Sequence, residues 1–423
     1  MSSLKDWVVK ILLVKLREPV VNPPVVPSLG LWGLRAIAKM VDSTNQITIL
    51  DEGKNPDSLE DTLKNGDFDV VGISGMFAVQ HFEFIKNIAI AKSYGKKVIV
   101  GGIHATNVAR NYPDLIDDIC IGEGENWFAK FLGFDKILAI NEYPNPYAES
   151  LRLEMKSYWS IKRPFGLTSI TDNWVPFETS RGCPRSCDFC IVPEYWGGWR
   201  PIGLEKVNDR MSFLADKGIQ EVFISDDNMS ANKQYFLSIM ERFRYYEFYW
   251  STPNGFSAKT VLDDNCFKAI SRTNCWQLQV AFDATTNKSA DLIDMKSKFV
   301  EYEDAMKITN RLRDAGIKSV GFFLIGYPGQ TLKDMQNTLD FANALPLDNR
   351  HIHIATPYPG TDLFRDCIKN GWLNCDPHEI YSKFIGNKSY QISIIQTPEF
   401  TPEQVVELRA KDREAALKRK GLL

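Results

Sequence analysis

Short apolar runs alternate with amphipathic stretches through the first third of the chain. Five runs rich in β-branched residues recur at regular intervals, at residues 11–14, 46–50, 70–73, 97–100 and 118–121. Near-continuous apolar runs are typical of strands buried on both faces of a parallel sheet. Helical patterns lie between them, at residues 31–40, 59–64 and 82–94. This alternation predicts a doubly wound, Rossmann-like α/β domain over residues 1–143.

The alternation of strands and helices returns in the second half of the chain. Six strand-like runs follow one another, at residues 175–179, 221–225, 246–250, 277–281, 319–325 and 351–354. This count fits a (β/α)6 partial TIM barrel over residues 173–375. In such a barrel the ligands lie at the carboxyl ends of the strands.

The segment between these two domains, residues 144–172, reads as a linker. Pro144 and Pro146 disfavour both a helix and a central strand. Its aromatic residues, in place of flexible glycine and serine, indicate a linker that packs across both domains.

The end of the chain, residues 376–423, carries one clear helix. Thr401 is a cap and Pro402 occupies the first turn, and the helix over 405–420 ends in basic residues followed by a glycine. We expect a small C-terminal helical extension that could close the open side of the barrel or shape a substrate cavity.

Composition narrows the class of protein. The chain has 423 residues, 44% of them hydrophobic, which is enough for two or three cores. The formal net charge of -3 gives no electrostatic footprint for nucleic acid, and no clear nucleic-acid site is expected. No apolar run reaches transmembrane length, and no signal-peptide cleavage site follows the first apolar patch. We therefore expect a cytoplasmic protein without a membrane span.

The clearest cluster of potential metal ligands is formed by three cysteines spaced C-x3-C-x2-C: Cys183, Cys187 and Cys190. Three thiolates can hold three irons of a [4Fe-4S] cube, which leaves the fourth iron open to a small molecule. Gly182 and Pro184 allow the tight turns that so short a loop needs. Zinc is the alternative, but a structural zinc site takes four ligands and no fourth lies nearby.

The other cysteines are scattered. We interpret them as buried thiols, while a second cluster remains conceivable with wide ligand spacings: Cys266, Cys275, Cys367 and Cys375.

The cysteine loop, with Phe189 just before its last cysteine, resembles the radical S-adenosylmethionine (SAM) superfamily. The resemblance implies that SAM chelates the open iron. It also implies that an electron from the cluster, supplied by an external donor of the flavodoxin or ferredoxin type, cleaves SAM to methionine and a 5'-deoxyadenosyl radical.

The strand ends of the barrel continue the resemblance. Residues 281–283 stand where the family has G-x-E-S, and residues 326–331 where it has G-x-P-G-E-T, with Gln330 in place of the acid. The SAM contacts implied in this way are Phe189, Ser225, Asp226, Asp227, Ser251, Asp283, Gly326 and Pro328. Helix capping is the alternative role for the two aspartates after the second strand.

The strand ends of the first domain are rich in glycine, and no G-x-G-x-x-G follows the first strand. Their order resembles the cobalamin-binding domain that precedes many radical SAM domains. The contacts implied are Ser74, Gly75, Gly101, Gly102, His104, Gly122 and Glu123. No D-x-H-x-x-G histidine follows the first strand, so that loop offers cobalamin no axial imidazole. A retained fold without cofactor is the alternative, and a local hydrogen bond is the alternative role of His104.

Together these resemblances imply a cobalamin-dependent radical SAM enzyme that methylates an unactivated carbon. The cofactors implied are a [4Fe-4S] cluster, SAM and cobalamin, because an inert C–H bond offers neither an acidic proton nor a nucleophile. The alternatives are a non-methylating radical SAM enzyme, such as a cyclase, a rearranging or a C–S bond-forming enzyme, and a cluster- or cobalamin-binding sensor. The sequence identifies neither the substrate nor an acid or base.

Overall fold

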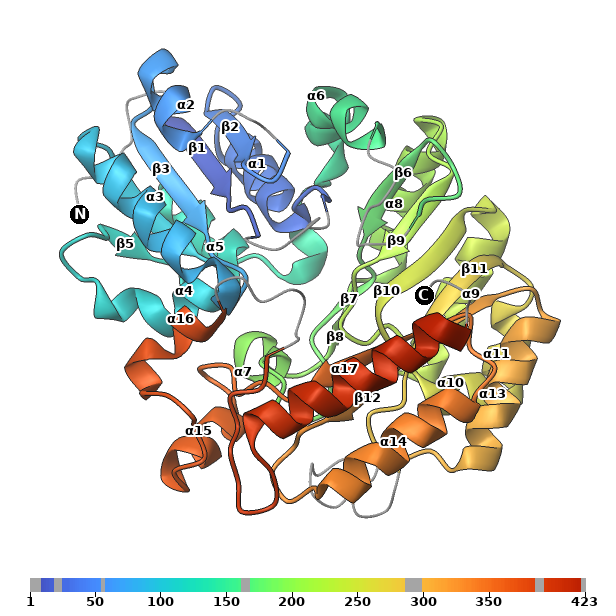
Figure 1. Ribbon diagram of the computed structural model, residues 1–423. Helices are drawn as coiled ribbons and strands as arrows, with labels where there is room; N and C mark the ends of the chain where they lie inside the picture. Colours follow the sequence, from blue (N-terminus) through green and yellow to red (C-terminus); the bar gives the residue numbers. More distant parts are fainter. Residues whose placement is uncertain are drawn as a thin grey trace. The chain divides into compact units, whose positions relative to one another are not determined.

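The computed structural model describes residues 9–18, 25–54, 58–160, 168–285, 299–384 and 392–419 (Figure 1). The chain divides into two compact units. The first consists of Met1–Phe177 and Ile202–Glu221, and the second of Glu178–Pro201 and Val222–Leu423.

A five-stranded sheet in the order β2-β1-β3-β4-β5 forms the centre of the first unit (Figure 1). All of its pairings are parallel. The strands are β1 (Lys10–Lys15), β2 (Gln46–Asp51), β3 (Val70–Ser74), β4 (Lys97–Gly101) and β5 (Asp118–Ile119). The predicted doubly wound domain is therefore confirmed, with a last strand shorter than expected because the chain turns at Gly122, where φ is +76°.

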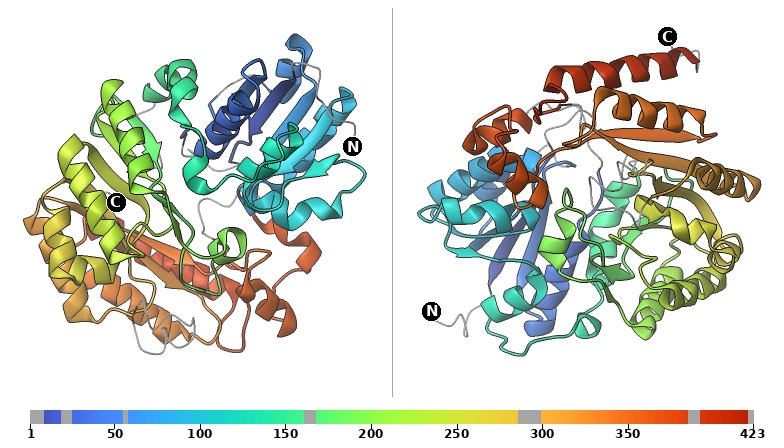
Figure 2. Two further views of the ribbon diagram at one scale, coloured as in Figure 1. Left: turned by 180° about the vertical axis from the view of Figure 1, so that it is seen from behind. Right: turned by 90° about the horizontal axis from the view of Figure 1, so that it is seen from below.

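Helices cover both faces of this sheet (Figure 2). They are α1 (Leu29–Val41), α2 (Leu59–Asn65), α3 (His81–Ser93), α4 (Ile103–Val108) and α5 (Gly124–Phe131). On one face, Ile11 and Leu13 of β1 pack with Leu31 of α1 and Phe128 of α5 in a single buried cluster. Burial of apolar side chains on both faces explains the continuous hydrophobic runs of the strands.

The expectation of a helix-free linker is wrong for α6 (Tyr147–Trp159), a helix of 13 residues. Pro146 does not prevent this helix, because it precedes the first turn, where a missing N–H costs nothing. Within the first unit the helix contacts the sheet domain through Tyr158, whose hydroxyl donates to Asp51 at 2.6 Å. It also contacts β6, since the Tyr147 hydroxyl donates to the carbonyl of Pro176 at 2.9 Å.

A second sheet has six strands in the order β13-β12-β11-β10-β9-β6. Its strands are β6 (Trp174–Phe177), β9 (Glu221–Ile224), β10 (Tyr249–Ser257), β11 (Asn274–Ala281), β12 (Lys318–Ile325) and β13 (Asn349–Ile354). The strands from β10 to β13 pair in parallel. Six strands in sequential order match the predicted partial barrel.

The expected end of the third barrel strand at Trp250 is wrong. β10 continues to Ser257, because its pairing with β11 shifts register between Thr252 and Phe256, and this irregularity accommodates Pro253. Ser251 is therefore inside the strand and fully buried.

Further helices alternate with these strands or follow them. Before β12 they are α7 (Val192–Trp196), α8 (Leu204–Asp216), α9 (Lys233–Tyr246), α10 (Ala258–Leu262), α11 (Asp264–Ile270) and α13 (Tyr302–Asp314). After β12 they are α14 (Leu332–Ala344), α15 (Asp362–Lys369), α16 (Ile380–Phe384) and α17 (Pro402–Arg419). Within the described residues, no helix has both the length and the apolarity needed to cross a membrane.

The predicted C-terminal helix is present as α17 and lies beside α14 (Figure 1). Asp412 on this helix accepts a hydrogen bond from Asn343 of α14 at 2.9 Å and forms an ion pair with Arg350 of β13 at 3.0 Å. The Arg409 Nε donates to the carbonyl of Ile352 at 2.8 Å. The C-terminal extension therefore contacts β13, the last strand of the sheet.

Replacing Tyr158 with phenylalanine tests the docking of α6 on the first sheet. The variant removes one buried hydrogen bond to Asp51, so we expect the free energy of unfolding to fall by about 1–2 kcal/mol in urea titrations. Tyr245, whose ring is 78% exposed, is the matched control, and Tyr245→Phe should change stability by less than about 0.5 kcal/mol. Equal effects of the two substitutions would contradict this view of α6.

Candidate functional site

The three cysteines lie on a loop whose two ends are held together by a small ribbon. Strand β7 (Ser180–Arg181) pairs antiparallel with β8 (Arg200–Pro201), on either side of the loop and α7. Gly182 starts the loop with φ of +78°, and a Cβ there would lie 2.6 Å from the carbonyl oxygen of Gly198. Only glycine fits this position without strain.

None of the cysteines forms a disulfide, and those of the loop differ in exposure. Cys187 is buried, while Cys183 and Cys190 are partly exposed. The amide of Cys190 donates to the carbonyl of Cys187 at 2.9 Å, which curls the loop's second half. In the described part of the chain no three His, Cys, Asp or Glu side chains already stand together as metal ligands, so binding a cluster would draw the loop thiols together. The donor set itself, three thiols on one short loop, fits a [4Fe-4S] cluster.

Two aspartates after β9 fix the beginning of the cysteine loop. Asp226, which is 5% exposed, accepts from the amide and hydroxyl of Thr179 at 2.7 and 2.6 Å and from the Ser180 hydroxyl at 2.6 Å. Asp227 accepts from the amide of Gly182 at 3.0 Å. Burial raises the pKa of Asp226 to about 7 and that of Asp227 to about 6, against the opposing effect of these hydrogen bonds.

The predicted SAM contacts at this strand end are thus engaged with the chain itself. The side-chain oxygens of Asp226 are occupied by three donors, and the carbonyls of Ser225 and Asp226 both accept from the Asn254 amide, at 3.0 and 3.2 Å. The capping alternative is wrong, because the helix after β9 is capped by Asn232, whose side chain accepts from the amide of Tyr235 at 2.9 Å. The contact of the two carboxylates with SAM stays a prediction. The hydrogen bonds that Asp226 accepts show a positioning role that the sequence pattern did not reveal.

A further hydrogen bond connects the cysteine loop to the segment that follows β12. The Tyr327 hydroxyl donates to the carboxylate of Asp188, and the amide of Leu363 donates to the Asp188 carbonyl at 2.9 Å. Burial raises the pKa of Asp188, and burial together with Asp188 raises the pKa of Tyr327. This contact could not be found from the sequence, because nothing in the spacing links Tyr327 to residue 188.

The other predicted SAM residues spread over four places in the second unit. Phe189 lies half-buried in the loop, and Gly326 and Pro328 are buried after β12, where a Cβ on Gly326 would approach Val405 of α17 to 3.0 Å. Asp283 follows β11 and its charge acts on His353 of β13. Ser251 lies well before the carboxyl end of β10, where Ser257 instead accepts from Arg185 of the cysteine loop at 3.4 Å.

In the first unit, the predicted glycines meet at the carboxyl edge of the five-stranded sheet. The amide of Gly75 donates to the carbonyl of Gly101 at 2.9 Å, and the amide of Gly122 donates to the Thr106 hydroxyl at 3.2 Å. Gly102 has φ of +96°, and a Cβ there would lie 2.5 Å from the carbonyl oxygen of Gly75. Ser74 is the last residue of β3, and Glu123 precedes α5.

Around these glycines the same edge exposes apolar side chains. They are Met76 (36% exposed), Phe77 (45%), Phe82 (48%) and Ile121 (46%). Large exposed apolar side chains gathered beside close-packed glycine backbone suit a flat, partly apolar ligand. The edge therefore fits the corrin ring of cobalamin.

His104 forms a local hydrogen bond, the alternative that sequence analysis gave for it. Its Nε2 lies 3.1 Å from Nδ1 of His81, whose Nε2 lies 3.3 Å from the Tyr112 hydroxyl. Burial lowers the pKa of His81 to about 4, and burial and the neighbouring His81 lower that of His104 to about 3. Both imidazoles are neutral at physiological pH.

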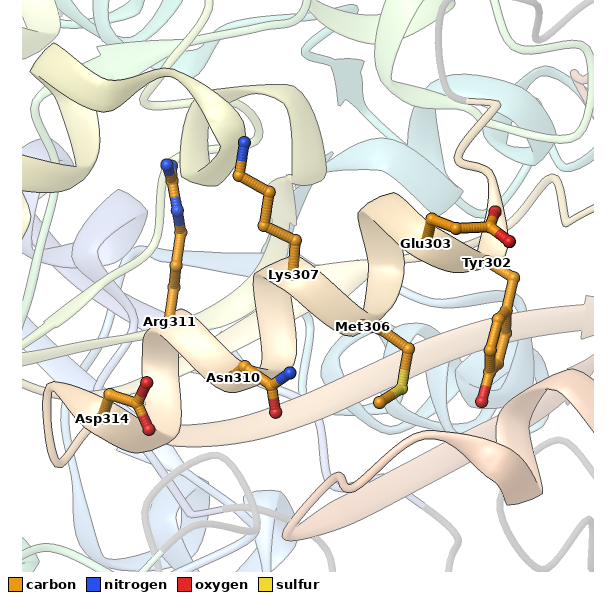
Figure 3. A pocket seen from close by; sticks show the side chains of 7 residues that line it. All are labelled: Tyr302, Glu303, Met306, Lys307, Asn310, Arg311 and Asp314. Atoms are coloured by element: carbon orange, nitrogen blue, oxygen red, sulfur yellow. The ribbon is translucent and has the colours of Figure 1, made fainter.

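A hollow lies along the outer face of α13 (Figure 3). Its lining comes from this one helix, with Lys307 and Arg311 extending to one side and Tyr302 and Met306 to the other (Figure 3). Arg311 is held by the carbonyls of Val261 and Leu262, at 3.0 and 2.9 Å. The hollow contains none of the predicted site residues and is not a candidate site.

The fit of Gly182 can be tested by a pair of glycine variants. Gly182→Ala forces a Cβ against the Gly198 carbonyl and strains the backbone by about 1–3 kcal/mol, so we expect iron and sulfide bound per chain to fall severalfold after anaerobic reconstitution. Gly198→Ala is the control, since no atom lies within 4 Å of its added Cβ. If both variants load iron equally, the strained turn does not position the ligands.

The histidine pair predicts a specific acid sensitivity of the first unit. Unfolded histidines bind protons below a pKa of about 6.5, whereas His81 and His104 resist protonation down to about 4 and 3. The unfolded chain therefore binds more protons, and the free energy of unfolding falls as the pH drops from 6.5 to 4. The double variant His81→Gln/His104→Gln should show a flatter dependence in urea titrations between pH 7 and 4.5, and the exposed His378→Gln should not. An unchanged slope in the double variant would contradict the assignment.

Comparison with known proteins supplies independent information. The model of the radical SAM superfamily matches residues 177–342, and that of the B12 binding domain matches residues 25–132. An uncharacterized methyltransferase of Pyrococcus horikoshii is 26% identical over 81% of this chain and 79% of its own length. Cytidylyl-2-hydroxyethylphosphonate methyltransferase of Streptomyces wedmorensis is 24% identical over 88% of this chain and 79% of its own length.

Among solved structures, the radical SAM methyltransferase TsrM of Kitasatospora setae has the same fold. The TM-score is 0.67 at 15% identity, over 87% of this chain and 77% of that one. The two domain matches confirm the predicted order of domains and the predicted cofactors, a [4Fe-4S] cluster, SAM and cobalamin. The chain therefore contains a B12-binding domain followed by a radical SAM domain.

Proposed function

We propose that the protein is a cobalamin-dependent radical SAM methyltransferase that methylates an unactivated carbon. The observation that carries this proposal is the pairing, in one chain, of a three-cysteine loop on a β/α barrel with a glycine-rich, apolar sheet edge suited to a corrin. The methyltransferase names of the relatives support the methyl-transfer step.

In this proposal the cofactors supply the radical and the methyl group, and the protein positions them. Cys183, Cys187 and Cys190 hold three irons, and Asp226, Asp227 and Tyr327 keep their loop in place. The residues proposed to contact SAM are Phe189, Ser225, Asp226, Asp227, Ser251, Asp283, Gly326 and Pro328. Those proposed to contact cobalamin are Ser74, Gly75, Gly101, Gly102, His104, Gly122 and Glu123.

The hydrogen bonds and the burial of these residues make some of them better candidates for a cofactor contact than others. For His104 the main chain is the favoured contact, because its ring is bonded to His81. For Asp226 the favoured role is positioning, because its carboxylate already accepts three hydrogen bonds. Ser251 is the weakest SAM candidate, since it is buried inside β10 and not at the strand's end.

The superfamily takes its electron from an external reductant, and we propose a flavodoxin- or ferredoxin-type donor. A reactive cluster and eight thiols without disulfides fit the reducing cytoplasm. We also propose functional boundaries at residues 1–143, 144–172, 173–375 and 376–423, with α6 as a structured connector.

Product analysis tests this function. The full chain is reconstituted without air with iron, sulfide and cobalamin, reduced, and given SAM. We expect cluster absorbance, and both 5'-deoxyadenosine and S-adenosylhomocysteine by mass spectrometry, because the reduced cobalamin would accept the methyl group of one SAM while the cluster cleaves another. Cys187→Ala should abolish the cluster absorbance and reduce 5'-deoxyadenosine at least about a hundredfold, a loss typical of removing an essential group. Cys375→Ala, a partly exposed cysteine outside the loop, should change neither.

Three results would contradict the proposal. 5'-Deoxyadenosine without S-adenosylhomocysteine would indicate a non-methylating radical SAM enzyme. Cobalamin and cluster binding without any SAM cleavage would indicate a sensor. Persistent cleavage in Cys187→Ala would remove the loop from the chemistry altogether.

A further inference from the structure

The turn after β9 places three consecutive side chains against the segment that leads into the cysteine loop. Asp226 and Asp227 accept hydrogen bonds from residues 179–182 of that segment. The third side chain, that of Asn228, contacts the next position, because its Nδ2 donates to the Sγ of Cys183 at 3.5 Å. This is a hydrogen-bond distance, since a sulfur acceptor is larger than an oxygen. Asn228 therefore contacts one of the three proposed iron ligands directly.

The side-chain amide of Asn228 is buried and held on its other side as well. The residue is only 8% exposed, and its Oδ1 accepts from the Ser230 hydroxyl at 3.4 Å. Its main-chain carbonyl accepts from the amide of Ala231 at 3.3 Å. A thiolate that binds iron has no proton to donate, so only the N–H side of the amide can face it. Both sides of the amide thus fit a donor directed at Cys183.

These contacts hold Cys183 through its main chain and through its side chain. The amide of the preceding residue, Gly182, donates to Asp227 at 3.0 Å, while Asn228 holds the sulfur. Groups that contact a metal ligand, without touching the metal, fix the direction in which the ligand points. Asn228 is placed to do this for the first cysteine of the loop.

An N–H group that donates to a cluster sulfur also changes the reduction potential. Reduction by one electron, here from the proposed external donor, adds negative charge that the thiolate sulfurs share. A hydrogen bond to an acceptor becomes stronger as the acceptor becomes more negative, so it stabilises the reduced state more than the oxidised state. The amide of Asn228 should therefore make the cluster easier to reduce.

We propose that Asn228 is a positioning residue for the [4Fe-4S] cluster: its side-chain N–H holds the thiolate of Cys183 and raises the reduction potential of the cluster. This inference rests on the proposed function. It adds to that function a residue outside the cysteine motif and outside the predicted SAM contacts.

A redox titration of the reconstituted full chain without SAM, followed by electron paramagnetic resonance, tests the proposal. Asn228→Leu removes the N–H and keeps about the same side-chain size. At a fixed solution potential we expect the ratio of reduced to oxidised cluster to fall about tenfold, which is a midpoint potential about 59 mV lower for one electron. Asn228→Ala, which cannot clash with its neighbours, should show a similar fall.

The matched control is Asn232→Leu. Asn232 is an exposed asparagine of the same turn, and its side chain accepts from the amide of Tyr235 at 2.9 Å. This variant loses a helix cap and should keep the midpoint potential of the wild type, because the cap does not act on the cluster.

One result would overturn the inference: a midpoint potential within about twofold of the wild-type ratio in both Asn228 variants, at equal iron and sulfide content. Loss of the cluster from both variants, with the circular dichroism of the wild type and with normal loading of Asn232→Leu, would support the holding of Cys183 by this amide. A wild-type chain without any [4Fe-4S] signal would contradict the proposed function itself, so the two failures are distinguishable.

Discussion

The position of the cysteine loop depends on two carboxylates after β9, that of Asp226, which is buried, and that of Asp227, which is half-buried. Asp226 and Asp227 accept four hydrogen bonds from the stretch between β6 and the cysteines, through Thr179, Ser180 and Gly182. Buried carboxylates are costly unless donors surround them, so these bonds are held strongly once formed. They hold the beginning of the loop. The middle of the loop is held by the hydrogen bond between Asp188 and Tyr327, which follows β12. A loop with so little regular structure is positioned by these few polar contacts.

In the first unit, the carboxyl edge of the sheet stays exposed, as binding of a large ligand requires. Glycines let the three loops pack backbone against backbone, and apolar side chains are left exposed around them. The neutral His81–His104 pair, with Tyr112, fills the space below this edge without bringing a charge into it.

Much of this could be predicted from the sequence because it follows from periodicity and spacing. The strands of both sheets, α1 and α3 follow their apolar patterns, and α17 follows its cap and its basic end. For the cysteine motif, a [4Fe-4S] cluster is the interpretation that fits the number of ligands. The helix α6 could not be predicted, since its stability comes from Asp51 and Pro176, distant in sequence. The extension of β10 through Pro253 depends on a register shift against β11. The hydrogen bond between Tyr327 and Asp188 joins residues that have no periodic relation in the sequence.

The proposed chemistry requires, above all, an iron of the cluster that has no protein ligand and is free to bind SAM. Electron paramagnetic resonance of the reduced, reconstituted full chain, recorded before and after adding SAM, tests this most directly. The account predicts a reduced [4Fe-4S] signal whose g values shift on adding SAM and which disappears as 5'-deoxyadenosine forms. A cluster signal that SAM leaves unchanged, or a protein that binds only zinc at its thiols, would contradict it.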